Sequence, residues 1–187
     1  MLNLTKTKIY RGSTLFLTGL LLAFSSFFLS GCLEGDSNVD ELGQEALEAY
    51  NKQLAIDTLA IKQHLADNSI TNAKSTKSGV FYVEQNVGTG VQAQAGHVVK
   101  TDYKLLNLAG DVLDTSYGKT PYQFQITGRT GPGNPILGYQ IATTLLKVGG
   151  KSTFYLPSGL AYGTTGSPPK IAPNTILIFE IELLEAR

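Results

Sequence analysis

Hydrophobic and polar positions follow two different periods along the chain. From Asp40 to about Ala66, apolar residues recur at steps of three and four, the spacing of one face of an α-helix. These apolar positions are Leu42, Ala46, Leu47, Tyr50, Leu54, Ile61 and Leu65. The pattern predicts an amphipathic helix over residues 40–66. The sequence leaves three partners open for its apolar face: the following domain, a second copy of the chain or another polypeptide.

A polar segment rich in Asn, Ser, Thr and Lys, from Asp67 to Gly79, follows this helix and marks a domain boundary. Beyond it the period shortens to two, which is typical of strands with one buried face. Strands are expected in VFYVEQ from Val80, HVVKTDYKLL from His97, YQFQIT from Tyr122, KSTFYL from Lys151 and TILIFEIELL from Thr175.

The last of these strands shows the alternation most clearly. Leu177, Phe179, Ile181 and Leu183 share one face, which we expect in the core, while Glu180 and Glu182 lie on a face expected to be mostly in solvent. Between the third and fourth strands, GYQIATTLLK has apolar residues at helical spacing, enough for one short helix across a sheet. The fold class predicted is therefore α+β, with an antiparallel sheet and one short helix.

The first 31 residues differ from the rest of the chain. Lys6, Lys8 and Arg11 precede the apolar run LFLTGLLLAFSSFFL, and residues 1–31 contain no acidic residue. This profile is typical of a signal peptide. The run from Leu15 to Leu29 is shorter than the roughly 20 residues that cross a bilayer, which favours a signal peptide over a permanent transmembrane anchor.

Cys32 is the single cysteine of the chain and ends the sequence LSGC directly after the apolar run. LSGC resembles the lipobox of bacterial lipoproteins, which implies that Cys32 is acylated and becomes the first residue after cleavage. A small buried cysteine is the alternative. The short polar segment 32–39 is then a tether. This assignment predicts a lipid-anchored protein of the bacterial cell envelope, in the outer membrane facing the periplasm, because Leu33 rather than Asp follows Cys32.

Composition and motifs exclude several kinds of chemistry. Lys and Arg number 15, as do Asp and Glu, so the chain has no basic excess for nucleic acid and no nucleic-acid partner is expected. His64 and His97 lie far apart in the sequence without metal-ligand spacing, so no metal site is expected. The chain also has no GxSxG element and no phosphate-binding loop, and no cofactor is expected.

Several motifs in a fixed order carry more specific information. They are DYKLLNLAGDVLDTS, PYQFQI, PILGYQIA, LKVGGKSTFYLPSGLAYG and APNTILIFEIELL. With these motifs, residues 79–187 resemble an FKBP-type peptidyl-prolyl cis-trans isomerase domain. The resemblance implies a twisted antiparallel sheet wrapped around a short helix, with an apolar cleft between them that takes a proline side chain. Residues 40–78 would then form the preceding helix and linker.

The resemblance also implies the residues of the site. The implied catalytic residues are Tyr103, Asp114 and Tyr162. The implied substrate-binding residues are Leu113, Tyr122, Ile136, Tyr139, Ile171 and Phe179. In the family pattern, the Ile136 N–H and the Tyr162 hydroxyl hold client carbonyls, Tyr139 forms the floor, and Asp114 orients the tyrosines.

The chain departs from the family pattern at three places. Leu113 stands where the most active members have Phe, Tyr139 stands where they have Trp, and the loop 127–135 is longer than usual. The implied function is isomerisation of X-Pro bonds in exported proteins, with low activity, proline-containing polypeptides as partners, and a homodimer through helix 40–66 left open. The alternative is a non-catalytic proline-peptide-binding chaperone or an envelope assembly module of the same fold.

Overall fold

The computed structural model describes residues 37–187. The predicted signal peptide 1–31, Cys32 and the first part of the tether 32–39 lie outside the described residues. Within residues 37–187, none of the helices combines the length and the hydropathy needed to span a membrane.

The predicted amphipathic helix is present as α1, which runs from Ser37 to Asp67. It begins before the expected Asp40, so the last residues assigned to the tether belong to the helix. Residues 41–52 of α1 are all exposed, whereas Asp57, Ile61 and Leu65 are buried. Packing of α1 on the following domain is therefore confirmed for its C-terminal half.

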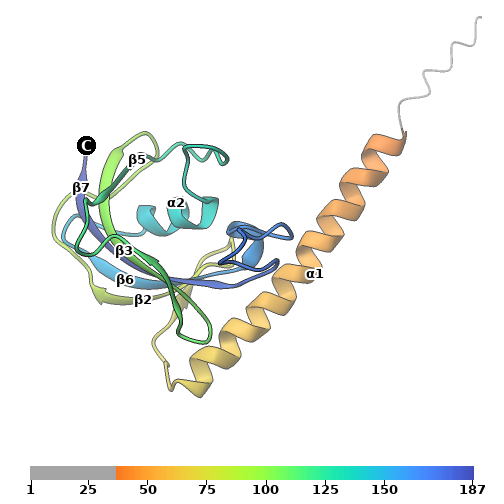
Figure 1. Cartoon of the computed structure of the whole chain (residues 1–187), viewed down its shortest axis with the longest axis horizontal. Coiled ribbons are helices and arrows are strands. Elements are labelled where there is room, and N and C mark those ends of the chain that lie inside the picture. The colour runs from red at the N-terminus through yellow and green to blue at the C-terminus, as the bar shows by residue number, and fades with distance from the viewer. Residues whose placement is uncertain (1–36) are drawn as a thin grey trace, which may run out of the picture. The chain divides into compact units, whose positions relative to one another are not determined.

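The described chain forms one antiparallel sheet of seven strands, in the order β1-β2-β6-β7-β3-β4, with β5 paired to β3 (Figure 1). The strands are β1 (Lys74–Ser75), β2 (Phe81–Asn86), β3 (Val98–Asn107), β4 (Val112–Thr115), β5 (Tyr122–Gln125), β6 (Lys151–Leu156) and β7 (Leu177–Ala186). All five predicted strands are confirmed. β4 was not predicted, and β1 lies inside the polar segment that was expected to be only a linker.

Two helical segments accompany the sheet, the short helix α2 (Leu137–Thr144) and the 3-10 helix η1 (Ser158–Leu160). Figure 1 shows the sheet curving around α2, as the α+β prediction requires. Leu177, Phe179, Ile181 and Leu183 are all buried in the core between sheet and helix. The period-two pattern of β7 therefore places its apolar face correctly, and the predicted fold is confirmed.

A second apolar cluster lies on the other face of the sheet and corrects one expectation. Ile178 of β7 is only 8% exposed, where a mostly solvent-facing surface was predicted. It packs with Tyr155 of β6 and with Ile61 and Leu65 of α1. The C-terminal half of α1 thus buries apolar residues on the face of the sheet away from α2, which alternation within a single strand does not reveal.

Candidate active site

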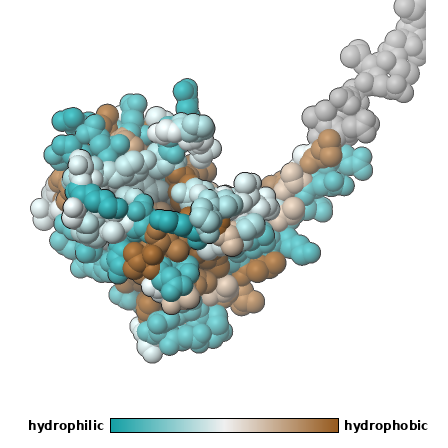
Figure 2. All heavy atoms as spheres, viewed as in Figure 1, coloured by the Kyte–Doolittle hydropathy of each residue, from teal (hydrophilic) through white to brown (hydrophobic). Residues whose placement is uncertain are grey.

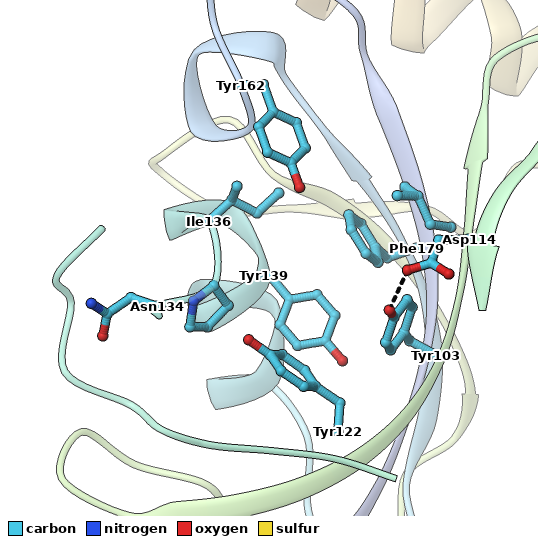
Figure 3. Close-up of a pocket in the computed structure, with 10 residues that line it drawn as sticks. Tyr103, Asp114, Tyr122, Asn134, Ile136, Tyr139, Tyr162 and Phe179 are labelled. Atoms are coloured by element: carbon cyan, nitrogen blue, oxygen red, sulfur yellow. Dashed lines mark hydrogen bonds between the residues drawn. The ribbon is translucent and has the colours of Figure 1, made fainter. Parts of the chain in front are cut away.

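An open cavity of about 200 Å³ lies between α2 and the sheet (Figure 3). Aromatic side chains dominate its lining, which comes from β3, β4, β5, β7, the start of α2 and the segment after η1. The lining residues are Tyr103, Leu105, Asp114, Tyr122, Asn134, Pro135, Ile136, Tyr139, Tyr162 and Phe179. A small concave site with aromatic walls and a few polar groups suits an apolar ring with a peptide backbone attached.

Tyr139 lies at the bottom of the cavity and is only 2% exposed. Its ring is 5.0 Å from that of Phe179, measured between centroids, in an edge-to-face arrangement. Its hydroxyl forms a 2.7 Å hydrogen bond with Oγ1 of Thr101, so the buried polar end is paired. Burial is the main cause that raises the pKa of Tyr139, which keeps the floor of the cleft uncharged.

The approach of α2 to the sheet depends on Gly138. A Cβ atom at this position would lie 2.9 Å from both Cδ1 of Leu156 and the carbonyl oxygen of Leu160. The absence of a side chain lets the first turn of α2, which carries Tyr139, lie against β6 and η1.

Tyr103 and Asp114 form the polar side of the cavity. The Tyr103 hydroxyl donates a 2.6 Å hydrogen bond to Oδ2 of Asp114, marked in Figure 3. The Thr115 N–H donates to Oδ1 at 2.8 Å, and Lys119 Nζ lies 3.6 Å from the same oxygen. The Tyr103 hydrogen bond is the main cause that lowers the pKa of Asp114, while burial raises the pKa of Tyr103. At neutral pH the pair is therefore a neutral phenol donating to a carboxylate.

Tyr162 follows η1 and occupies the rim of the cavity, 38% exposed. Figure 3 shows its hydroxyl pointing toward the space between Ile136 and Phe179. Partial burial is the first cause that raises its pKa, and the negative charge of Asp114 adds to it. The hydroxyl therefore stays protonated at neutral pH and can donate a hydrogen bond to a ligand.

Ile136 stands directly before α2 and lies beside Tyr162 at the edge of the cavity (Figure 3). Among the hydrogen bonds of residues 37–187, none is donated by its backbone N–H, while its carbonyl accepts from the N–H of Tyr139 at 3.1 Å. An unpaired backbone donor at the rim of a cavity is available for a carbonyl of a bound peptide. With the Tyr162 hydroxyl, it gives the cleft two donors.

The loop 127–135, which precedes Ile136, is held by the side chain of Gln140. This side chain is 1% exposed. Its Oε1 accepts from the N–H groups of Thr127 and Gly128 at 3.1 and 2.9 Å, and its Nε2 donates to the carbonyls of Arg129 and Pro135 at 2.7 and 2.9 Å. These four bonds use the full capacity of the amide. One residue of α2 thus fixes the loop 127–135, which was noted from the sequence as longer than in the family pattern.

Most of the residues implied by the sequence resemblance come together in this cavity. Tyr103, Asp114, Tyr122, Ile136, Tyr139, Tyr162 and Phe179 all line it. Leu113 and Ile171 do not; they line a neighbouring cavity that shares Leu105, Asp114 and Tyr162 with it. The presence of Leu113 where the family pattern has Phe therefore affects the edge of the site rather than its floor.

Three lining residues were not assigned from the sequence: Leu105, Asn134 and Pro135. Leu105 could have been found, since it lies two positions after Tyr103 on the same face of β3. The other two belong to the longer loop, for which the family pattern gives no position. No cluster of three or more His, Cys, Asp or Glu side chains suited to a metal ion occurs among residues 37–187.

The fold and the cleft together define an antiparallel α+β domain with an aromatic ligand site, and comparisons with known proteins agree. Residues 90–184 match the family model of FKBP-type peptidyl-prolyl cis-trans isomerases. The chain therefore belongs to the FKBP-type peptidyl-prolyl cis-trans isomerase family, as the sequence resemblance indicated.

Individual relatives support this assignment. The chain is 40% identical over 109 residues to "FK506-binding protein 4" of Dictyostelium discoideum, covering 57% of this chain and 28% of the relative. It is 32% identical over 126 residues to a probable FKBP-type peptidyl-prolyl cis-trans isomerase FkpA of Neisseria meningitidis, covering 67% and 43%. The chain thus corresponds to less than half of the length of either relative.

Solved structures show the same similarity. The crystal structure of FkpA from Escherichia coli aligns with a TM-score of 0.60 at 27% identity, covering 81% of this chain and 73% of that one. A peptidyl-prolyl cis-trans isomerase from Pseudomonas syringae aligns with a TM-score of 0.58, also at 27% identity, covering 71% and 94%.

Proposed function

We propose that the chain catalyses cis-trans isomerisation of X-Pro peptide bonds in the cleft between α2 and the sheet. One observation carries this proposal: a single small cavity combines a buried aromatic floor at Tyr139 with two donors at its edge, the Ile136 N–H and the Tyr162 hydroxyl, that have no hydrogen-bond partner among residues 37–187. An apolar ring and the carbonyls on either side of it could be bound together there.

The physical problem that the site has to solve is amide resonance. Rotation about an X-Pro bond faces a barrier of about 20 kcal/mol, because the partial double bond must be lost in the twisted state. The twisted amide carries less charge separation than the planar amide. Transfer from water to an apolar cavity therefore costs the twisted form less than the planar form, which lowers the barrier to rotation. The neutral tyrosines provide such surroundings.

Each polar group then has a specific task. The Ile136 N–H and the Tyr162 hydroxyl hold the backbone of the peptide while the bond between them turns. The carboxylate of Asp114 accepts from the Tyr103 hydroxyl and so fixes the wall of the cleft. No proton has to be transferred in this mechanism.

The test is isomerisation of a series of X-Pro tetrapeptides by the full chain, alongside Tyr162→Phe and Asp114→Ala. The proposal predicts acceleration by the parent and a reduced rate in both variants with the fold retained. A folded parent that binds the peptides without accelerating isomerisation would instead support the non-catalytic binding module. A parent that neither binds nor accelerates would support an assembly module.

We further propose that the protein acts on exported polypeptides while anchored by a lipid at Cys32 in the outer membrane, facing the periplasm. The support is the sequence alone, in which LSGC follows an apolar run with a basic flank. Mass spectrometry of the N-terminal peptide tests the acylation. Cys32→Ala is expected to abolish the modification and release the protein from the membrane fraction.

A homodimer through α1 is a separate proposal. The N-terminal half of this helix exposes Leu42 and Leu47 at 66% and 59%, and Figure 2 shows hydrophobic residues along it. A second copy of the same helix would cover them. Sedimentation equilibrium tests this: a dimer that becomes a monomer in Leu42→Glu, Leu47→Glu supports it, and a monomeric parent contradicts it.

A further inference from the structure

A buried carboxylate links α1 to the segment that carries Tyr162. Asp57 is 2% exposed, although an aspartate is rarely buried unless its charge is paired. Its Oδ2 accepts two hydrogen bonds of 2.7 Å, one from the N–H and one from the hydroxyl of Ser158, which lies 101 residues further along the chain. Its Oδ1 accepts a 2.8 Å bond from Nε2 of Gln53 in the preceding turn of the helix.

Ser158 passes this anchorage on to the rim of the cleft. It is the first residue of η1 and is fully buried. Its carbonyl accepts from the N–H of Ala161 at 2.9 Å and from the N–H of Gly163 at 2.8 Å. Because these two residues flank Tyr162, the backbone on both sides of the rim tyrosine is bonded to the serine that Asp57 holds.

Close packing of α1 against the same turn reinforces the link. A Cβ atom on Gly159 would lie 2.6 Å from Cε2 of Tyr50, so the tyrosine ring lies directly on the backbone of η1. Gly79 is in similarly close contact with α1, since a Cβ there would lie 2.9 Å from Cδ1 of Leu54. Figure 1 shows this side of α1 next to the segment that contains η1.

We propose that α1 is a positioning element of the active site, and that Asp57 sets the place of the Tyr162 hydroxyl through Ser158. The inference rests on the proposed function, because it assigns a role to α1 in the same reaction. Asp57 is a positioning residue: it acts on the client only through Tyr162.

The test compares Asp57→Asn with a matched control on the same helix. Asp67 also accepts a hydrogen bond from the glutamine four residues before it, Gln63, at 2.7 Å, but this pair is exposed. Asp57→Asn removes the negative charge and replaces one of the two carboxylate oxygens by an amide group, so Oδ2 and Oδ1 can no longer accept from Ser158 and Gln53 together as charged acceptors. We expect kcat/KM of the full chain to fall about tenfold, in keeping with the cost of misplacing a group that orients the substrate. In Asp67→Asn we expect a change below about twofold, as for an exposed contact.

A double variant separates positioning from general destabilisation. If Asp57 acts through Tyr162, Asp57→Asn should cost little additional activity in a chain that already carries Tyr162→Phe. A loss that simply multiplies with that of Tyr162→Phe would overturn the proposal. So would wild-type kcat/KM in a folded Asp57→Asn chain.

Two further measurements keep the test decisive. If Asp57→Asn does not fold, Ser158→Ala, which removes only the hydroxyl bond, is expected to lower kcat/KM a few-fold, and an unchanged value contradicts the proposal. If the parent itself has no isomerase activity, the proposed function fails independently. The amide NMR signals of Ala161 and Gly163 then decide the link, since they should shift in Asp57→Asn and stay in place in Asp67→Asn if α1 positions this turn.

Discussion

Replacing Gln140 should uncouple the loop 127–135 from α2 and so disturb both stability and activity. Gln140→Met keeps the length and approximate shape of the side chain but removes its amide. The change leaves the N–H groups of Thr127 and Gly128 and the carbonyls of Arg129 and Pro135 without their partner.

The size of the effect follows from these four bonds. Each intramolecular hydrogen bond contributes about 0.5–1.5 kcal/mol net, which gives an upper sum of about 6 kcal/mol. The residues of the loop from Thr127 to Asn134 are exposed, so several of the freed groups can turn to water. We therefore expect a loss of about 2–4 kcal/mol in the free energy of unfolding, a large part of the total of about 5–15 kcal/mol of an ordinary domain.

The assay is urea unfolding followed by circular dichroism, together with X-Pro isomerisation below the unfolding transition. Gln125→Met is the matched control, because this exposed glutamine makes one bond, from its Nε2 to the carbonyl of Gly96. We expect the control to stay within about 0.5 kcal/mol of the parent. The folded Gln140→Met chain should show weaker peptide binding, because the loop places the Ile136 N–H.

Gln140→Glu adds a pH signature. One carboxylate oxygen can still accept from Thr127 and Gly128, but the other faces the carbonyls of Arg129 and Pro135, which disfavours the charged form and raises the pKa of the new carboxyl group. Because the folded-state pKa of this carboxyl group is raised, the Gln140→Glu chain is most stable below the ordinary carboxyl pKa of about 4.3. Its free energy of unfolding then falls as the pH rises through the folded-state pKa. A Gln140→Met chain as stable as the parent, or a Gln140→Glu deficit that does not grow with pH, would refute this reasoning.

Three further predictions concern the floor and wall of the cleft. The pKa of Asp114 is lowered chiefly by the Tyr103 hydroxyl, so the Asp114 carboxylate stabilises the fold above its ordinary pKa of 3.8, and this stabilisation is lost as the pH falls through the lowered folded-state pKa. Because no proton is transferred in the proposed mechanism, kcat/KM should be level from about pH 5 to about pH 9, and a bell-shaped profile in this range would contradict that mechanism. Tyr139→Phe leaves Thr101 without its 2.7 Å partner and should cost about 1–2 kcal/mol in urea unfolding with activity largely kept; an unchanged stability contradicts the assigned bond. Gly138→Ala drives a methyl group against backbone and should cost about 1–3 kcal/mol by the same measurement, and a neutral result would show that α2 can move away.

The strands that could be predicted from the sequence are those with one buried face. β7 and β3 bury alternate residues, and that alternation is visible in the residue types. β4 escaped prediction because it buries no complete face: Val112 is 54% exposed and the strand is short. β1 consists of two residues, both exposed, and it joins the sheet only by pairing with β2. A pattern within so short a segment does not encode that pairing.

The cleft could be assigned from the sequence only through ordered motifs. The pairing of Tyr103 with Asp114 and the burial of Tyr139 follow from how distant strands and α2 meet, and the family pattern supplies that arrangement. Asp57 could not be found in this way. An acidic residue in an amphipathic helix normally faces water, and its partner Ser158 is brought to it only by the docking of α1.

The same limit applies to the residues at the edge of the site. Leu113 and Ile171 were assigned to the cleft from their places in the motifs, but they line the neighbouring cavity together with Pro168 and Lys170. Residue type and order therefore located the elements around the cleft correctly. The direction of each side chain depended on the tertiary packing.

The most direct test of the central claim is exchange NMR on a short X-Pro peptide in which the cis and trans forms give separate signals, with a small molar fraction of the full chain added. The account predicts exchange cross-peaks between the two forms that are absent without the protein, together with shifts of the Ile136 and Tyr162 amide signals. It also predicts that the cross-peaks weaken with Tyr162→Phe. Amide shifts at the cleft without any acceleration of exchange, from a chain shown to be folded, would contradict it.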